Sequence, residues 1–216
     1  MTDTARTSKS ITLPPTDTNG ADFPSYQPAT ASADFASFID AARRFQDLAS
    51  SSAPDDDTWR AATEHLDAAN ALLQPHQAAE GHPPAGRALE LPGMGNPLLP
   101  AWSITSASPE GVTLHGQFSR FYLGANNIVF GGALPLLFDW TFAIANAAAG
   151  RPLSRTGYLH LDYRKPVPIT TDLTATGQTT HIDGRKTTLH ATLTDLTGSV
   201  LAEAETLTIG IHAHNR

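Results

Sequence analysis

The chain of 216 residues has room for one sizeable domain with an extension, or for two small domains. Its formal net charge of −7 and the lack of a basic run argue against nucleic acid as a partner. Because the chain contains no cysteine, disulfides, thiolate chemistry and cysteine-based zinc sites are excluded, and we expect a cytoplasmic protein.

The first third of the chain predicts a tail followed by helices. Residues 1–31 are rich in Thr, Ser, Pro and Asp, which predicts a mobile tail. Apolar residues then recur at helical spacing on both sides of Pro54, which predicts a helical hairpin at about 32–74. Prolines between 75 and 100 indicate an irregular connector, so 32–100 form one segment. Phe45 and Trp59 require burial, so we expect the hairpin to pack against the rest of the chain.

Residues 101–216 predict a second segment of different character. Apolar residues alternate around Val112 and Leu114, and an apolar helix follows at 133–149. Four further strand patterns run over about 157–164, 171–182, 186–197 and 199–211, with hairpin turns at Asp183-Gly184 and Gly198-Ser199. One helix followed by an antiparallel meander predicts an α+β domain.

The helix at 133–149 carries the most informative chemistry. It is apolar nearly all round, so we expect it to be covered on every side, with Asp139 held in apolar surroundings that raise its pKa. Asp139 also makes a membrane span improbable. Gly131 and Gly132 begin the helix, where unsatisfied N–H groups create an oxyanion site.

The spacing between these two features predicts a second subunit. Gly131 and Asp139 are eight residues apart, which is about 12 Å along a helix and too far to hold one carbonyl group. Two copies of the helix side by side would place Gly131 of one chain near Asp139 of the other. The spacing therefore favours a homodimer.

These residues carry a resemblance to a known family. Gly131-Gly132, the following Asp139 and the apolar helix resemble the signature of hotdog-fold acyl-CoA thioesterases of the phenylacetate-pathway (PaaI-like) type. Supporting similarity lies in Thr156–Pro166, in Gly184-Arg185-Lys186 and in Ala202–Glu205, so the resemblance covers about 101–212. It implies an antiparallel sheet wrapped around the long helix.

The resemblance also implies roles for individual residues. Asp139 would be the general base or the nucleophile, and the Gly131 N–H, beside Gly132, would polarise the thioester carbonyl. Thr156 would support the acid or its water, although a threonine is also ordinary in a strand. Asn126 would orient water, although asparagine is also an ordinary turn residue.

One position departs from the family pattern. Phe130 stands where the family usually has a histidine, and it can neither donate a hydrogen bond nor shuttle a proton. We assign Phe130 to substrate binding. This departure motivates a second hypothesis, a non-catalytic acyl-CoA or lipid-binding hotdog protein. A hotdog hydratase would need an Asp-His pair, and none is evident near Asp139.

The predicted ligand is an acyl-CoA, with CoA as part of the substrate and no separate cofactor or metal. Arg164, Lys165, Arg185 and Lys186 cluster at predicted strand ends, where they could bind the CoA phosphates or be solvated edge charges. We expect a homodimer, or a tetramer built as a dimer of dimers. The helical hairpin either packs on the sheet or covers the acyl tunnel.

Overall fold

The computed structural model describes residues 11–14 and 27–211. In these residues the helices are α1 (Ala33–Ser51), α2 (Asp56–Leu73) and α3 (Ala133–Ala148), with short 3-10 helices η1 (Gln74–His76), η2 (Pro92–Gly95) and η3 (Arg120–Tyr122). The strands are β1 (Ser103–Ser108), β2 (Gly111–Gly116), β3 (Ser154–Tyr163), β4 (Leu173–Asp183), β5 (Lys186–Asp195) and β6 (Val200–Gly210).

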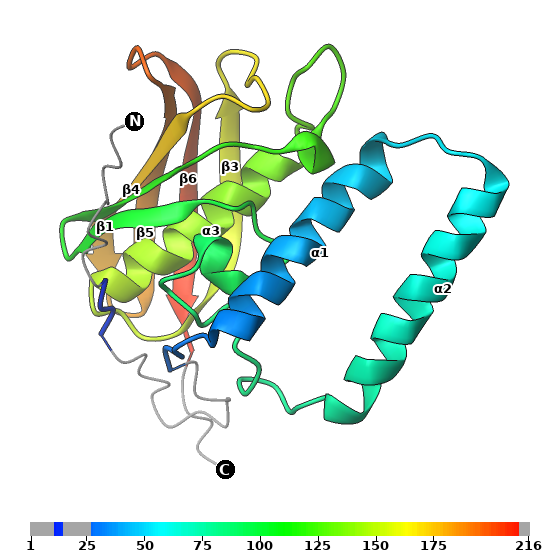
Figure 1. Cartoon of the computed structure of the whole chain (residues 1–216). Coiled ribbons are helices and arrows are strands. Elements are labelled where there is room, and N and C mark those ends of the chain that lie inside the picture. Colours follow the sequence, from blue (N-terminus) through cyan, green and yellow to red (C-terminus); the bar gives the residue numbers. More distant parts are fainter. Residues whose placement is uncertain (1–10, 15–26, 212–216) are drawn as a thin grey trace, which may run out of the picture.

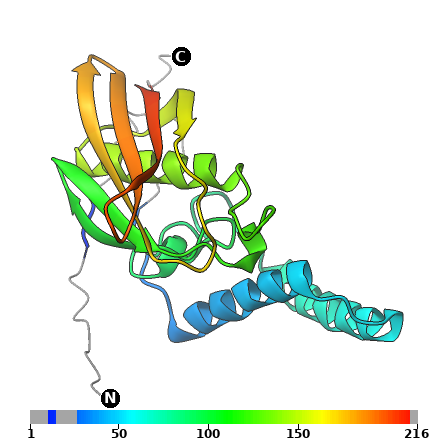
Figure 2. The same cartoon turned by 90° about the horizontal axis from the view of Figure 1, so that it is seen from above.

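The six strands form one antiparallel sheet in the order β1-β2-β4-β5-β6-β3. α3 runs across one face of this sheet, which curves around it (Figures 1 and 2). β3 pairs only with β6, so in the described part of the chain its other edge has no partner strand. The predicted α+β domain is therefore confirmed.

The core lies between α3 and the inner face of the sheet. Phe138 and Phe142 are almost completely buried, and each contributes about 1.5–3 kcal/mol by removing its ring from water. Gly177 on β4 allows α3 to approach closely, since a Cβ there would lie 2.8 Å from Cγ2 of Thr141. The alternating buried residues of β4, β5 and β6 complete this layer: Leu173, Ala175, Leu189, Ala191, Leu193, Ala202 and Ala204.

The prediction that this helix is covered on every side is wrong for the single chain. Asp139 and Ala143 are exposed on α3, and Leu136 and Ala147 are only partly buried. These four residues are three or four positions apart, so they form one stripe along the helix. We call this set the open stripe of α3. Its existence shows that the sheet of one chain does not enclose its own helix completely.

β1 is a strand that the sequence pattern did not predict. Its sequence, Ser-Ile-Thr-Ser-Ala-Ser, is polar, and only Ile104 is fully buried. The strand forms because the turn before Gly111 brings it beside β2, where it pairs from Ser103↔His115 to Ser108↔Gly111. Pairing with a neighbour, rather than its own apolar pattern, therefore determines this element.

α1 is anchored to the domain mainly through polar groups. Nη2 of Arg43 donates to the carbonyl oxygens of Pro92 and Asn96 at 2.9 and 3.2 Å. The carboxylate of Asp47 accepts a hydrogen bond from the N–H of Phe121 at 2.8 Å. Burial lowers the pKa of the Arg43 guanidinium and raises that of the nearby Tyr122 hydroxyl to about 12. α1 is thus held firmly against η2 and η3.

α2 differs from α1 because none of its residues is buried. Both predicted helices are present, but the expected burial of Phe45 and Trp59 is not found within the chain, where they are 42% and 41% exposed. The linker between the helices is extended at Ser52 (ψ 152°) and at Asp55 (ψ 168°), and it separates α2 from α1 (Figure 1). The two helices are therefore not a packed hairpin.

The predicted mobile tail, residues 1–31, lies mostly outside the described residues, as do His212 and His214. Within the described parts, Leu13 is buried and the Ala29 N–H donates to the Arg87 carbonyl oxygen at 3.0 Å. Among the described residues, no helix is both long and apolar enough to cross a membrane.

Candidate active site

The N-terminus of α3 presents two unsatisfied amide groups. The first turn is closed by hydrogen bonds from the Ala133 N–H to Phe130 O at 2.9 Å and from the Leu134 N–H to Gly131 O at 3.3 Å. Within the described part of the chain, the N–H groups of Gly131 and Gly132 have no acceptor, and both residues are exposed. The positive end of the helix dipole lies at the same place, so this turn can stabilise an anionic oxygen.

Asp139 lies in the middle of α3 and has one specific partner. The Thr156 hydroxyl on β3 donates to Oδ1 of Asp139 at 2.9 Å. Thr156 pairs with the inward-facing Thr208, and a bulge follows immediately, because the register shifts between Thr156 and Tyr158. The bulge allows β3 to direct Thr156 toward α3 while its later residues keep their own pairing.

The surroundings of Asp139 differ from the prediction. Its side chain lies on the open stripe and is exposed, so the expected apolar enclosure is absent in the single chain. The carboxylate is nevertheless oriented, because Thr156 occupies one of its oxygens and leaves Oδ2 available. Asp139 and the Gly131 amide lie eight residues apart along α3 and its N-terminus, which corresponds to about 12 Å at the rise of an α-helix.

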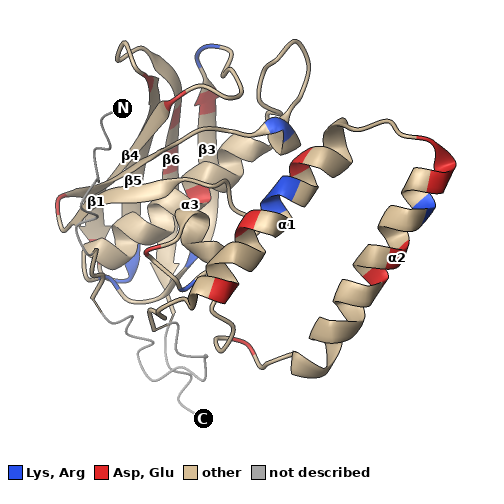
Figure 3. Cartoon of the chain, viewed as in Figure 1, with Lys and Arg blue, Asp and Glu red and all other residues tan. Residues whose placement is uncertain are grey.

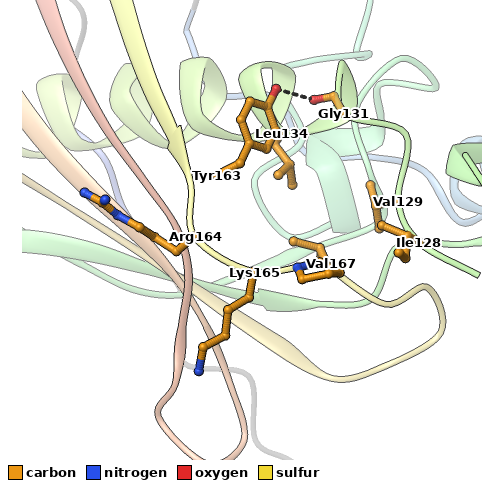
Figure 4. A pocket seen from close by; sticks show the side chains of 9 residues that line it. Ile128, Val129, Gly131, Leu134, Tyr163, Arg164, Lys165 and Val167 are labelled. Atoms are coloured by element: carbon orange, nitrogen blue, oxygen red, sulfur yellow. Dashed lines mark hydrogen bonds between the residues drawn. The ribbon is translucent and has the colours of Figure 1, made fainter.

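Tyr163 is a site residue that the sequence analysis did not single out. Its hydroxyl donates to the carbonyl oxygen of Gly131 at 2.9 Å, which ties the end of β3 to the start of α3 (Figure 4). The residue was part of the quoted family motif, but its role depends on a contact across 32 positions. Only the folded chain reveals that contact.

A pocket of about 320 Å³ lies beside this hydrogen bond. Its wall contains the apolar residues Val129, Leu134 and Val167. The side chains of Arg164 and Lys165 extend away from Tyr163 at its margin (Figure 4). The pocket is therefore apolar inside and basic at one side.

Phe130 is 63% exposed and lies directly before the two glycines. A Cβ on Gly132 would lie 2.6 Å from Cε1 of Phe130, so the ring lies against the start of α3. A side chain at position 132 would therefore require the Phe130 ring to move. The position is consistent with the predicted role of Phe130 in contacting substrate.

The turn geometry explains Asn126 without a catalytic role. Asn126 and Asn127 have φ of 53° and 58°, and the Ile128 N–H donates to Ala125 O at 3.0 Å. Asparagine tolerates this left-handed backbone better than most residues. No hydrogen bond joins Asn126 to Asp139 among the described residues, and its assignment to the site remains a prediction.

The four basic residues do not form the single cluster predicted from the sequence. Arg164 and Lys165 both donate their backbone N–H groups to Leu201 O, at the start of β6. Arg185 instead bonds to Gly210, at the end of β6. Because β6 runs the length of the sheet between them, the two pairs lie at opposite ends. Arg164 also contacts Glu203 at 2.8 Å and Asp162 at 3.1 Å, and the hydrogen bond that its guanidinium donates to Glu203 raises its pKa.

Within the described ranges, no group of three or more His, Asp or Glu side chains could hold a metal ion.

Comparison with known proteins shows which fold and superfamily this chain resembles. Residues 126–202 match the family model of the thioesterase superfamily. A crystal structure of RHA08564, a thioesterase superfamily protein, is 26% identical with a TM-score of 0.71, and covers 85% of this chain and 97% of its own. This architecture, a sheet curved around one long helix, is the hotdog fold. The resemblance to hotdog-fold thioesterases is thereby confirmed at the level of fold and superfamily.

Two other solved structures match about half of this chain. The Escherichia coli PaaI protein of the phenylacetic acid degradation operon is 19% identical, with a TM-score of 0.48 over 50% of this chain and 82% of its own. A Streptococcus mutans protein bound to acetyl CoA is 16% identical, with a TM-score of 0.49 over 52% of this chain and 90% of its own. A search of curated proteins gave no match.

Proposed function

We propose that the protein hydrolyses acyl-CoA thioesters to a free acid and CoA. The observation that carries the proposal is the Thr156–Asp139 hydrogen bond at 2.9 Å on a face of α3 whose N-terminus presents two unsatisfied amides. A positioned carboxylate and an oxyanion site are the two groups that thioester hydrolysis requires. The match of residues 126–202 to the thioesterase superfamily supports the same chemistry.

The active site in this proposal is shared by two subunits. Among the described residues, β3 has ten residues with one unpaired edge, and the open stripe of α3 lies beside it, because its Asp139 accepts a hydrogen bond from Thr156 of β3. An unpaired edge strand readily pairs with another strand. Pairing of β3 with β3 of a second copy would set two α3 helices side by side. Gly131 of one chain could then lie opposite Asp139 of the other. Within one chain the two residues are about 12 Å apart along the helix, which is too far for them to act on the same carbonyl group.

The reaction follows from these positions. Asp139 removes a proton from water through Oδ2, while the Thr156 hydroxyl holds Oδ1. The water oxygen attacks the thioester carbonyl carbon, and the Gly131 N–H of the other subunit stabilises the resulting oxyanion. Collapse of this intermediate breaks the carbon–sulfur bond, and the sulfur leaves as the thiol of CoA after it takes up the proton that Asp139 received from water. The acyl group leaves as a carboxylic acid, and no further cofactor is required.

Recognition of CoA is assigned to the pocket margin. Arg164 and Lys165 flank an apolar cavity of about 320 Å³ that begins at Gly131. Phosphates are commonly bound by such side chains, although Arg164 already contacts two carboxylates. Arg185 and Lys186, at the far end of β6, could contribute only from the other subunit. The tetrameric alternative and the cytoplasmic location remain predictions.

Phe130 keeps a second function open, namely acyl-CoA or lipid binding without turnover. It is 63% exposed at the position where the family usually carries a histidine, so the site has an apolar contact in place of a proton donor. This alternative and hydrolysis predict the same ligand. They differ only in whether the thioester bond is broken.

The test is release of free thiol from short-chain, long-chain and aryl acyl-CoA thioesters. The parent is compared with Asp139→Asn and, as a matched control, with Asp67→Asn on α2. We expect Asp139→Asn to lower kcat by roughly 10²- to 10⁴-fold, the usual contribution of a general base, while Asp67→Asn behaves like the parent. Saturable binding without thiol release would favour the carrier, and full activity in Asp139→Asn would remove Asp139 from the mechanism.

A further inference from the structure

α2 has an apolar stripe that the described residues of its own chain do not bury. Trp59, Ala62, Leu66, Ala69 and Leu73 are spaced by three, four, three and four residues, which is the pattern of a helix–helix seam. Trp59, Leu66 and Leu73 are 41%, 38% and 51% exposed, and none of the residues of α2 is buried. We call these five residues the α2 seam.

An uncovered seam on such a helix needs a permanent neighbour. An isolated helix of this length is only marginally stable in water, because most helical stability in proteins comes from packing of an apolar face. The extended linker at Ser52–Asp55 keeps α2 away from α1, so α1 cannot supply the cover. Figure 3 shows that the charges of α2 are mostly acidic, with only Arg60 basic, which leaves the apolar seam as its main surface for association.

The position of α2 indicates which neighbour covers it. α1 is anchored by Arg43 and Asp47, so the helices α1 and α2 (residues 33–73), which we call the arm, have a defined direction. Figures 1 and 2 both show α1 and α2 projecting to the right, the side on which β3 lies farther out than β4, β5 and β6. A second copy paired along β3 would occupy this same side. The arm would therefore extend over the partner rather than into solvent.

The N-terminal region that contains the arm also has counterparts in a similar structure. The similar structure covers 85% of the 216 residues, about 184, whereas only 116 residues follow position 100. At least about 68 of the first 100 residues therefore have counterparts in that fold. Within this region α2 is the helix that buries none of its residues in its own chain, so we expect α2 to make its contacts in an assembly.

We propose that the α2 seam packs on a second copy of this chain across the β3 edge, so that α2 of each subunit contacts the other subunit. A two-fold axis makes this contact twice, because the same surface is presented by both chains. The inference rests on the two-subunit arrangement of the proposed function, but not on the chemistry. It gives α2 a role in holding the shared active site together.

Trp59 provides a direct probe of the seam. Trp102 and Trp140 are 0% and 6% exposed, so Trp59 is the accessible tryptophan of an isolated chain. Acrylamide quenching of the full-length protein, with Trp59→Phe to subtract the other two signals, measures whether Trp59 is covered. The proposal predicts that Trp59 is shielded at concentrations where sedimentation shows a dimer and becomes accessible on dilution to the monomer.

Two lysine variants complete the experiment. Leu66→Lys places a charge in the seam, whereas Ala68→Lys adds the same charge on the opposite face of α2. We expect Leu66→Lys to expose Trp59 and to raise the dimer Kd by about tenfold or more, because an unpaired charge in an apolar contact is costly. Ala68→Lys should leave both quantities unchanged. Since α2 buries nothing in its own chain, neither variant should unfold the α3 domain.

The outcomes separate this inference from the proposed function. A dimer in which acrylamide quenches Trp59 freely, or identical behaviour of the two lysine variants, would overturn the proposed α2 contact but would not affect the proposed hydrolase function. If the unmodified protein were a monomer, both the α2 contact between subunits and the shared active site would be overturned. A dimer with Trp59 covered but no thiol release would overturn only the hydrolase.

Discussion

α2 and α3 have similar lengths, 18 and 16 residues, but opposite environments. In α3, eleven residues are buried, from Ala133 to Ala148, whereas α2 buries none. The difference separates the surfaces that hold one chain together from the surfaces that it leaves uncovered. The buried face of α3 stabilises the domain. The proposed function uses the open stripe and the β3 edge, and the further inference adds the α2 seam.

The largest effect is expected where α3 is most buried. Phe138→Ala should lower the free energy of unfolding by about 3–5 kcal/mol, because it removes a fully buried ring and leaves a cavity. Denaturant unfolding followed by circular dichroism measures this change. Leu196→Ala, at a side chain 73% exposed, is the control and should change stability by less than about 0.5 kcal/mol. Similar losses in both variants would contradict the assigned core.

The next largest effect is expected where α1 is attached to the rest of the domain. Arg43→Ala removes the hydrogen bonds to Pro92 and Asn96 and should cost about 1–3 kcal/mol, since two carbonyl groups lose a charged donor. Arg44→Ala, one position along α1 and exposed, should be nearly neutral. Thermal unfolding of both variants measures the difference. A neutral Arg43→Ala would show that α1 is not anchored through this residue.

Variants of Thr156 test whether its hydroxyl group is needed to orient Asp139 on the open stripe. Thr156→Ala removes the hydroxyl that orients Asp139, and we expect kcat to fall roughly tenfold, equivalent to about one hydrogen bond. Thr156→Ser retains the hydroxyl and should recover most of the rate. If serine and alanine were equally impaired, the methyl group rather than the hydrogen bond would be responsible.

The smallest effect is expected at Tyr163. Tyr163→Phe deletes the hydrogen bond to Gly131 O but keeps the ring, so kcat should fall about threefold while the fold is retained. Steady-state thiol release detects this change. The matched control is Tyr158→Phe, on the same strand as Tyr163, which removes a hydroxyl that donates to Glu205 of β6. A larger loss in the control would place the important tyrosine elsewhere on β3.

The sequence predicted the elements better than their environment. The 3.6-residue period and the glycine pair located α3 and its N-terminus correctly, because both depend on neighbouring residues. The exposure of Asp139 was predicted wrongly, since an apolar helix sequence does not reveal whether its cover comes from its own chain or from another. The Thr156–Asp139 contact followed only from the family resemblance. Tyr163 and the division of the basic residues depend on pairing between distant strands, which composition and spacing do not specify.

The central claim is that the two halves of the active site come from different subunits, and mixing two inactive variants tests it directly. Asp139→Asn lacks the base, and Gly131→Pro lacks the amide donor, whose N–H has no structural acceptor in the described chain. Circular dichroism must first show that each variant is folded.

After dissociation and random reassociation of equal amounts, half of the dimers are mixed, and each mixed dimer has one complete site. Thiol release should therefore return to about a quarter of the parental rate. No recovery from two folded, dimeric and exchanging variants would contradict the shared site and place Gly131 and Asp139 in separate roles within one chain.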